Sequence, residues 1–326
     1  MRNTNSAIGG YFELEISNRG TIYHDNALAL SSGRNGFEYI LITRGYKRVH
    51  IPYFTCDVML QPIKKLNLEY VFYHINESFT PLIKNYKANE AILYTNYFGL
   101  NHHNIELLIK EYPNVIIDNA QAFFDKPINY VSTFYSPRKF LGVPDGGFVF
   151  EDGAPSTKNY EQDNSIDRIM HLLTRIENGA ESGYELFKNN DAKLDNQPIK
   201  LMSNLTKKLL NGVDFENVIN KRRNNFNFVH RHLKHTNKLT QFIDIATITC
   251  PMVYPYWINN GNELRKLLTN NKIFTALYWP NVLEWVDNKT VEFEFANNIV
   301  CIPVDQRYNE ESIQRILSVI KKCIKF

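Results

Sequence analysis

The feature that most constrains this chain is a regular alternation of short apolar runs and helix-like segments between about residues 28 and 150. The apolar runs are rich in β-branched and aromatic residues, as buried strands are, whereas the intervening segments repeat apolar residues at helical spacing. A strand, a helix and a second strand form the βαβ unit, which builds parallel sheets covered on both faces. The pattern therefore predicts an α/β fold with a large, mostly parallel sheet.

The expected elements follow one another closely in this half of the chain. Strands are expected in RVHIPYF, LEYVFYHI, AILYTNYF, NVIIDNA, YVSTFYS and GGFVF, and helices at residues 35–44, 57–65 and 104–111. Ligands of such sheets gather at the carboxyl ends of the strands. Four polar residues lie just past an apolar run, and we expect them around one crevice: Tyr53, Asn96, Asp118 and Ser136.

The second half predicts a polar excursion and then a small α+β part. Residues 151–205 are rich in Asn, Asp and Gly, which favours a long excursion near the site or at a subunit interface, with one helix near 165–175. Helices are then expected at 214–235, 262–270 and 310–322, and strands in MVYPYWI, KIFTALYW and NIVCIPV. We therefore divide the chain into a large domain, residues 1–213, and a small domain, residues 214–326.

Composition narrows the class of protein. The net charge is only +3 with acids and bases mixed, whereas a nucleic-acid surface shows a stronger basic field. The cysteines are isolated, which argues against a zinc site: Cys56, Cys250, Cys301 and Cys323. The amino-terminal residues show no leader pattern, and no apolar run reaches membrane-spanning length. We expect a soluble, cytoplasmic protein without a metal, a nucleic-acid partner or a membrane partner.

Three segments carry residues suited to one chemistry. The first, VIIDNAQAFF, ends a buried strand with the carboxylate of Asp118. A buried carboxylate is unfavourable without a partner, and a protonated pyridinium nitrogen is such a partner. From this segment alone, an aspartate that only caps the following turn remains the alternative.

The second segment, STFYSPRKFLGVPDGGFVF, places Lys139 after a strand and before a Gly-rich return. A lysine that forms a Schiff base must be partly desolvated and close to a cation, and Arg138 could supply that charge. The hydroxyl of Ser136, three residues earlier, could bind a phosphate oxygen. Taken by itself, the segment favours an ordinary surface lysine.

The third segment, LALSSGRNGFEYIL, leads into a helix through Gly33, Arg34 and Asn35. The free backbone N–H groups and the positive dipole end of a helix start make a natural phosphate site. An ordinary helix start capped by Ser and Gly is the alternative. Together, the three segments give a phosphate site, an acid for a ring nitrogen and a Schiff-base lysine.

In this order the segments resemble the DegT/DnrJ/EryC1/StrS family of sugar aminotransferases, which are pyridoxal 5'-phosphate (PLP) enzymes of fold type I. SGRNGFEYIL resembles the family's phosphate-binding turn, VIIDNAQAFF its E-D-A-A-Q/H-A motif and SPRKFLGVPDGG its lysine loop. Further similar segments are VHIPYFTCDVML, NYFGL, TALYWP and IPVDQRYNEESIQRIL, so the resemblance covers most of the chain. It implies a large PLP-binding domain and a small carboxyl-terminal α+β domain.

The resemblance implies a role for each matched residue. Lys139 would carry the cofactor and shuttle the substrate's α-proton, Asp118 would pair with the ring nitrogen, and Gln121 would lie near the 3-hydroxyl. The phosphate would be held by four residues: Gly33, Arg34, Asn35 and Ser136. Tyr278 falls where the family often has a histidine near the substrate. Besides Tyr278, we expect two residues at strand ends to contact the substrate: Tyr53 and Asn96.

The resemblance also implies a reaction and an assembly. Glutamate would give its amino group to the cofactor, and a nucleotide-linked keto-sugar would receive it. The product would be an amino-deoxy sugar for surface polysaccharide or a glycosylated metabolite. Lys139 favours transamination over dehydration, because the dehydrating relatives typically lack this lysine. The sites of the family lie at a dimer interface, so a homodimer is implied.

Three features depart from the family. The segment KLDNQPIKLMSNLTKKLL does not contain the family's interface motif, so the partner residue that touches the phosphate is not identified. Cys56 stands where some members stack an aromatic ring on the cofactor, a role that Tyr53 or Phe54 would then take. The chain is also short for the family. A non-catalytic relative that binds PLP or a sugar nucleotide in a regulatory role is therefore the alternative function.

Overall fold

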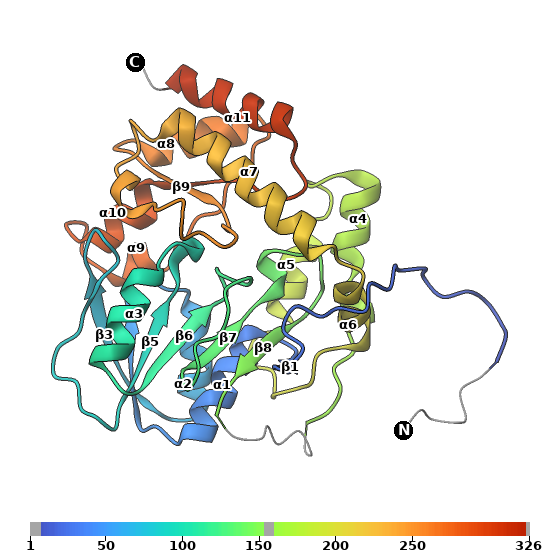
Figure 1. The fold of residues 1–326 in the computed structure, drawn as a ribbon, viewed down its shortest axis with the longest axis horizontal. Helices are drawn as coiled ribbons and strands as arrows, with labels where there is room; N and C mark the ends of the chain where they lie inside the picture. Colours follow the sequence, from blue (N-terminus) through green and yellow to red (C-terminus); the bar gives the residue numbers. More distant parts are fainter. Residues whose placement is uncertain (1–7, 153–159, 324–326) are drawn as a thin grey trace.

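One large sheet organises the chain in the computed structural model, which describes residues 8–152 and 160–323 (Figure 1). Its strands are β1 (Leu28–Leu30), β2 (Arg48–Pro52), β3 (Glu69–Ile75), β4 (Pro81–Leu82), β5 (Ala91–Thr95), β6 (Val115–Asn119), β7 (Ser132–Tyr135) and β8 (Gly147–Phe150). They lie in the order β1-β8-β7-β6-β5-β2-β3-β4. The five strands from β7 to β3 in that order are parallel, and the others pair antiparallel. The predicted α/β fold with a mostly parallel sheet is therefore confirmed.

The carboxyl ends of the central strands form a common edge. Strands β5, β6 and β7 are in register, so that Thr95 lies opposite Asp118 and Asp118 opposite Phe134. A short 3-10 turn, η3 (Pro137–Lys139), follows β7 almost directly. This register brings Asp118 and Lys139 to the same edge of the sheet, as the sequence predicted.

Two apolar clusters cover the two faces of the sheet. Helix α1 (Gly33–Arg44) packs Phe37 against Phe134 and Ile116 on one face. The next residue of β6, Ile117, belongs to the cluster on the other face. Alternate residues of a strand point to opposite faces, so Asp118 shares the face of α1, and Asn119 shares the opposite face with Ile117.

The polar excursion contains more helix than the sequence predicted. Its helices are α4 (Met170–Asn178), α5 (Tyr184–Ala192) and α6 (Asn204–Asn211), and a 3-10 turn, η4 (Ile166–Arg168), precedes them. Only the helix near residues 165–175 was expected. The segment of α5 reads YELFKNNDA, which has few apolar residues and therefore no strong helical pattern. The described ranges do not include residues 153–159 of the excursion. They also do not include residues 1–7, on which part of the prediction about a leader rests.

The remaining elements form a second, smaller sheet with its helices. They are α7 (Phe215–Leu233), β9 (Tyr254–Trp257), α8 (Gly261–Asn270), α9 (Val282–Trp285), α10 (Val291–Asn298), β10 (Ile299–Ile302) and α11 (Glu310–Cys323). Strands β9 and β10 pair antiparallel. Short helices α2 (Leu60–Lys65) and α3 (His102–Glu111) complete the first half. In Figure 1 the elements from α7 onward lie above the large sheet.

The strand predicted in KIFTALYW is wrong. Within it, Ala276 alone pairs, with Cys301, as an isolated bridge, and Lys272 has a positive φ of 57°. At the end of this segment Trp279 packs instead into an aromatic cluster, with its ring 5.1 Å from that of Phe54. Phe295 of α10 contacts the same ring, so one apolar core joins the two halves of the chain.

The described part of the chain contains no helix that is both long and apolar enough to cross a bilayer.

Candidate active site

Asp118 and Lys139 lie close enough to interact electrostatically at the edge of the sheet. Asp118 is buried, and its Oδ1 accepts a hydrogen bond of 2.8 Å from the backbone N–H of Ala120. Burial raises the pKa of Asp118 above its usual value, while the Lys139 ammonium and the Ala120 N–H oppose that rise. The carboxylate is thus held in a low-dielectric position, where a cationic partner has a strong effect on it.

Tyr278 and Cys56 complete the surroundings of the Lys139 amine. The Nζ atom lies 5.7 Å from the centroid of the Tyr278 ring. Burial raises the pKa of the Cys56 thiol to about 11, while the charges of Lys139 and Arg34 act to lower it. Cys56 is therefore close enough to Lys139 and to Arg34, at the start of α1, to be affected by both charges. The predicted substrate residue Tyr278 lies near Lys139, and Cys56 lies near both of them.

Gln121 presents an unpaired donor on a fully buried side chain. Its Oε1 accepts a 2.7 Å hydrogen bond from the backbone N–H of Phe98, which fixes the direction of the amide. Its Nε2 has no hydrogen-bond partner among the described residues. A buried donor without a partner is unfavourable. Gln121 is therefore suited to bind a ligand oxygen, which is the role that the sequence resemblance implied.

The start of α1 lies beside the lysine loop. A Cβ atom placed on Gly33 would be 3.7 Å from the Cβ of Ser136. A Cβ atom on Gly147 would collide with the Ser32 carbonyl, so only glycine permits this approach of the two segments. The first backbone N–H groups of a helix have no partner within the helix. Gly33, Arg34 and Ser136 therefore lie together at a potential anion site.

Asn35 lies at the same helix start but has other partners. Its side chain accepts from Ser31 Oγ and donates to the carbonyls of Gln197 and Pro198. Its backbone N–H donates to Ser32 Oγ, which caps the helix. These bonds hold the helix start in place, so the structure gives Asn35 a supporting position rather than a free group for the phosphate.

Two arginines flank this helix start. Arg34 comes from the first turn of α1, and Arg138 comes from η3, directly before Lys139. Both donate to Asp191 at the end of α5, and Arg34 also pairs with Asp195. Burial lowers the pKa of Arg138, whereas Asp191 opposes that change. The sequence suggested Arg138 only as a nearby charge and did not indicate the two acids.

Tyr53 and Phe54 pack against other aromatic rings. The Tyr53 ring stacks on Phe72 at 4.6 Å between centroids and an angle of 12°, and it also contacts His74. Phe54 is fully buried and packs against Trp279. The prediction that one of these rings takes over the stacking position at Cys56 is therefore wrong, because both rings are held in other aromatic contacts.

Asn96 belongs to the opposite face of the sheet. Its amide donates to Asn119 Oδ1 at 3.0 Å and to Asp125 Oδ2 at 2.7 Å, and its Oδ1 accepts from the Asn101 N–H. These residues border a cavity of about 450 Å³. A single crevice shared by Asn96 and Asp118 was therefore a wrong prediction, because the strand before Asn96 ends at Thr95 and the side chain turns the other way.

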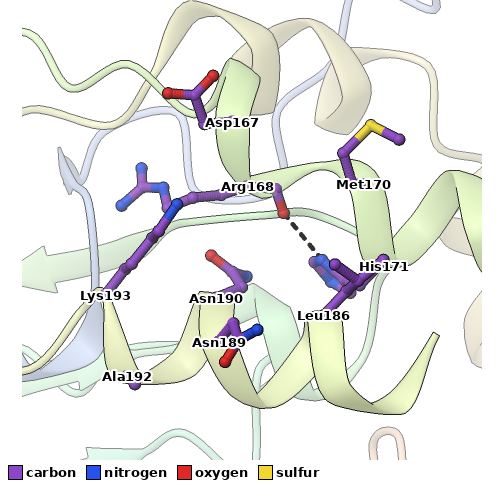
Figure 2. Close-up of a pocket in the computed structure, with 9 residues that line it drawn as sticks. All are labelled: Asp167, Arg168, Met170, His171, Leu186, Asn189, Asn190, Ala192 and Lys193. Carbon is purple, nitrogen blue, oxygen red and sulfur yellow. Dashed lines mark hydrogen bonds between the residues drawn. The ribbon is translucent and has the colours of Figure 1, made fainter.

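A second cavity, of about 470 Å³, lies between η4, α4 and α5 (Figure 2). Within it the Nδ1 atom of His171 lies 2.8 Å from the carbonyl oxygen of Arg168. Asn190 extends from α5 toward this cavity, and its amide reaches the carbonyl of Pro144 in the lysine loop at 2.9 Å. None of the predicted site residues borders this cavity, so it is not the predicted site.

Asp145 is a positioning residue that sequence reasoning missed. It is fully buried and accepts hydrogen bonds from the backbone N–H and the Oγ of Ser203, at 2.8 and 2.7 Å, and from Thr206. Asp145 therefore fixes the Gly-Gly return after Lys139 to the start of α6. The aspartate before paired glycines in VPDGG was the signal available in the sequence.

The described residues fit a PLP-like ligand at this edge of the sheet. The buried carboxylate of Asp118 suits a cationic ring nitrogen, and the unpaired Nε2 of Gln121 suits a ring oxygen. Lys139 lies near Asp118, and Gly147 lets the strand after the lysine loop approach the backbone at the start of α1. This combination of donor, acid, amine and anion site is typical of cofactor-binding sites.

Comparison with solved structures places the fold. An aminotransferase from Brucella abortus described as DegT DnrJ EryC1 StrS has a TM-score of 0.60 and 15% identity, over 91% of this chain and 85% of that one. DesV from S. venezuelae, in complex with a ketimine intermediate, has a TM-score of 0.64 and 15% identity, over 91% and 84% of the two chains. PseC from Helicobacter pylori, an aminotransferase of pseudoaminic acid biosynthesis, has a TM-score of 0.62 and 13% identity, over 91% and 86%.

No protein-family model and no curated protein sequence matches the chain. The structural similarity nevertheless extends over nine-tenths of the chain, and the similar structures include the sugar aminotransferase CalS13 from Micromonospora echinospora. The chain therefore has the fold of the DegT/DnrJ/EryC1/StrS aminotransferases, as the sequence segments predicted.

Proposed function

We propose that this protein is a PLP-dependent aminotransferase that moves an amino group from glutamate to a nucleotide-linked keto-sugar. The product class is an amino-deoxy sugar nucleotide, used for surface polysaccharide or a glycosylated metabolite. The observation that carries the proposal is the position of Lys139 beside the buried Asp118 at the edge of the parallel sheet. The shared fold supports it, because the similar structures include sugar aminotransferases.

The chain's own residues divide the work between binding and proton transfer. Asp118 holds the ring nitrogen in its protonated form, because a buried carboxylate stabilises an adjacent cation. Gln121 donates to the ring oxygen through Nε2, and Ser136 with the helix start holds the phosphate. When bound, PLP supplies an electron-withdrawing ring that makes the substrate's α-proton acidic.

Lys139 moves the proton. In this proposal its Nζ first takes the proton from the substrate's α-carbon as a general base. The protonated amine then donates that proton as a general acid. The Tyr278 ring lies 5.7 Å from this Nζ atom and borders the position in which the amine would work.

We further propose that the protein acts in the cytoplasm as a homodimer. Apolar side chains are exposed along α4 and α5, among them Met170, Ile176, Tyr184 and Phe187. Patches of this kind often mark protein interfaces. Light scattering during size-exclusion chromatography tests the assembly, and a monomer at micromolar concentration would contradict it.

The test of the cofactor is the visible absorption spectrum of the purified protein with added PLP, before and after borohydride. We expect a band that borohydride removes, with a label that mass spectrometry assigns to the peptide of Lys139, and we expect glutamate to bleach the band. Lys139→Ala should show neither the band nor the label. Lys126→Ala, an exposed lysine on the opposite face of the sheet, is the matched control and should keep both.

A band that persists in Lys139→Ala would contradict the proposal. Reversible binding of PLP without a borohydride-dependent label would favour the alternative, a non-catalytic binding protein. If the label and the glutamate response are present, a screen of nucleotide keto-sugars identifies the acceptor, and failure of every keto-sugar to restore the band would contradict the sugar assignment.

A further inference from the structure

Two arginines from different elements converge on one oxygen atom. Arg34 Nη2 lies 3.3 Å from Asp191 Oδ1, and Arg138 Nη1 lies 2.9 Å from the same atom. Arg34 also pairs with Asp195. The shared oxygen position lies next to the start of α1, and Arg138 directly precedes Lys139. It is a position where a single anionic oxygen receives hydrogen bonds from two guanidinium groups.

The arginines and the acids differ in burial. The side chains of Arg34 and Arg138 are 11% and 14% exposed, whereas those of Asp191 and Asp195 are 46% and 43% exposed. The guanidinium groups are therefore fixed in the wall of the site. The carboxylates are the water-accessible half of each pair, and they can turn into water when another anion takes their place beside the nearly buried guanidinium groups.

The backbone that carries the acids is anchored independently of the arginines. Asn190, next to Asp191, donates to the carbonyl of Pro144 and borders the cavity between α4 and α5 (Figure 2). The backbone N–H of Asn196, next to Asp195, donates to Gln61 Oε1 of α2 at 3.1 Å. Rotation of the two carboxylates therefore does not require α5 to leave the protein.

We propose that Arg34 and Arg138 are the dianion-binding half of the site, and that Asp191 and Asp195 occupy it until a phosphate group displaces them. The proposal rests on the proposed function for the identity of the phosphate carrier. The two cations and two carboxylates cancel, so a phosphate with nearly two negative charges adds an uncompensated excess unless the acids withdraw. Two guanidinium groups match a phosphate dianion in charge and in hydrogen-bond geometry.

The test compares three probes on the whole protein: PLP, pyridoxal, which lacks the phosphate, and inorganic phosphate. In Asp191→Asn/Asp195→Asn, we expect the affinity for PLP and for inorganic phosphate, measured by calorimetry, to rise about tenfold or more. The affinity for pyridoxal should change less than twofold, because pyridoxal does not reach the arginines.

A matched control separates the local effect from a change in net charge. Asp167→Asn/Glu185→Gln removes two exposed acids of the same region that do not contact the arginines, and it should leave all three affinities within twofold. Arg138→Met should lower the affinity for PLP and inorganic phosphate about tenfold and spare pyridoxal. Arg138→Lys keeps the charge and should lose less affinity for PLP and inorganic phosphate. It replaces Arg138→Met in the test if that variant proves unstable.

The inference would be overturned if the ratio of PLP affinity to pyridoxal affinity were the same in the wild type and in Asp191→Asn/Asp195→Asn. It would also be overturned if Arg138→Met bound inorganic phosphate as tightly as the wild type does. Failure of the proposed function gives a different result: no borohydride-dependent label on Lys139 in any variant. In that case the inorganic phosphate measurements still decide whether the arginine pair binds a dianion.

Discussion

Asp118 and Asn119 are neighbours on one strand, yet their polar surroundings differ in kind. On the Asn119 face, the amides and carboxylates satisfy one another: Asn96 donates to both Asn119 and Asp125. On the Asp118 face, the carboxylate has a hydrogen bond from Ala120 and the charge of Lys139 nearby. Just past the end of the same strand, the Gln121 Nε2 has no partner among the described residues.

Buried polar groups that have hydrogen-bond partners support the fold, whereas a buried polar group without a partner points to a functional position. Buried polar groups are nearly always hydrogen-bonded, so a buried donor left open indicates a position that a ligand completes. The closed network on the Asn119 face stabilises the loops at the ends of the strands. We therefore expect substitutions on the two faces to affect different properties.

The largest effect is expected for Lys139→Ala on the open face. Turnover with glutamate should fall at least about 10³-fold, because general base and covalent contributions disappear together. The melting temperature should be nearly unchanged, since the side chain is exposed. Added methylamine should restore part of the rate, and its failure together with a large loss of stability would show that Lys139 has a structural role instead.

Asp118→Asn should lower the rate of the glutamate half-reaction about 100-fold, because the ring nitrogen loses its anionic partner. The cofactor-free protein should become more stable at neutral pH. Since burial raises the pKa of Asp118, wild-type stability declines as pH rises from the unfolded-state value of 3.8 toward the folded-state value, and the amide avoids this loss. Urea unfolding from pH 4 to pH 8 measures the difference.

Asn119→Ala, on the closed face, should show the reverse pattern. Truncation removes the acceptor for Asn96, so the free energy of unfolding should fall by about 1–3 kcal/mol. The dissociation constant for PLP should stay within twofold of the wild type. A loss of cofactor affinity as large as the loss of stability would break the distinction between the two faces.

The smallest effect is expected for Gln121→Glu. The carboxylate keeps the bond from the Phe98 N–H but removes the free donor, so the affinity for PLP should fall about fivefold. A titration monitored by absorbance measures this change. An unchanged affinity would mean that the Nε2 atom does not contact the ligand.

Much of the fold could be predicted from the sequence because local patterns determine it. The strands and their parallel order follow from β-rich runs alternating with helical spacing, and Asp118 and Lys139 meet because parallel strands end at one edge. The helix that ends at Arg44 and the carboxyl-terminal helix were predicted from apolar residues at helical spacing.

The errors arose where side-chain direction or distant packing decides the outcome. Thr95 and Asn96 are adjacent, and this offset of one position places the two side chains on opposite faces, which a strand pattern with uncertain ends does not reveal. Asp191 and Asp195 lie in and after a polar helix without a clear pattern, so their contact with Arg34 and Arg138 had no local signal.

The start of α1 has a consequence for protein synthesis. The Ser31 carbonyl accepts from Gly146, and the Ser31 N–H donates to Lys200, so the segment leading into the helix is held by residues that are translated much later. At the usual rates of translation, Lys200 follows Ser31 by on the order of ten seconds. A nascent chain in that interval lacks the partners that position the start of α1, so this edge of the sheet is completed only after about two-thirds of the protein has been made.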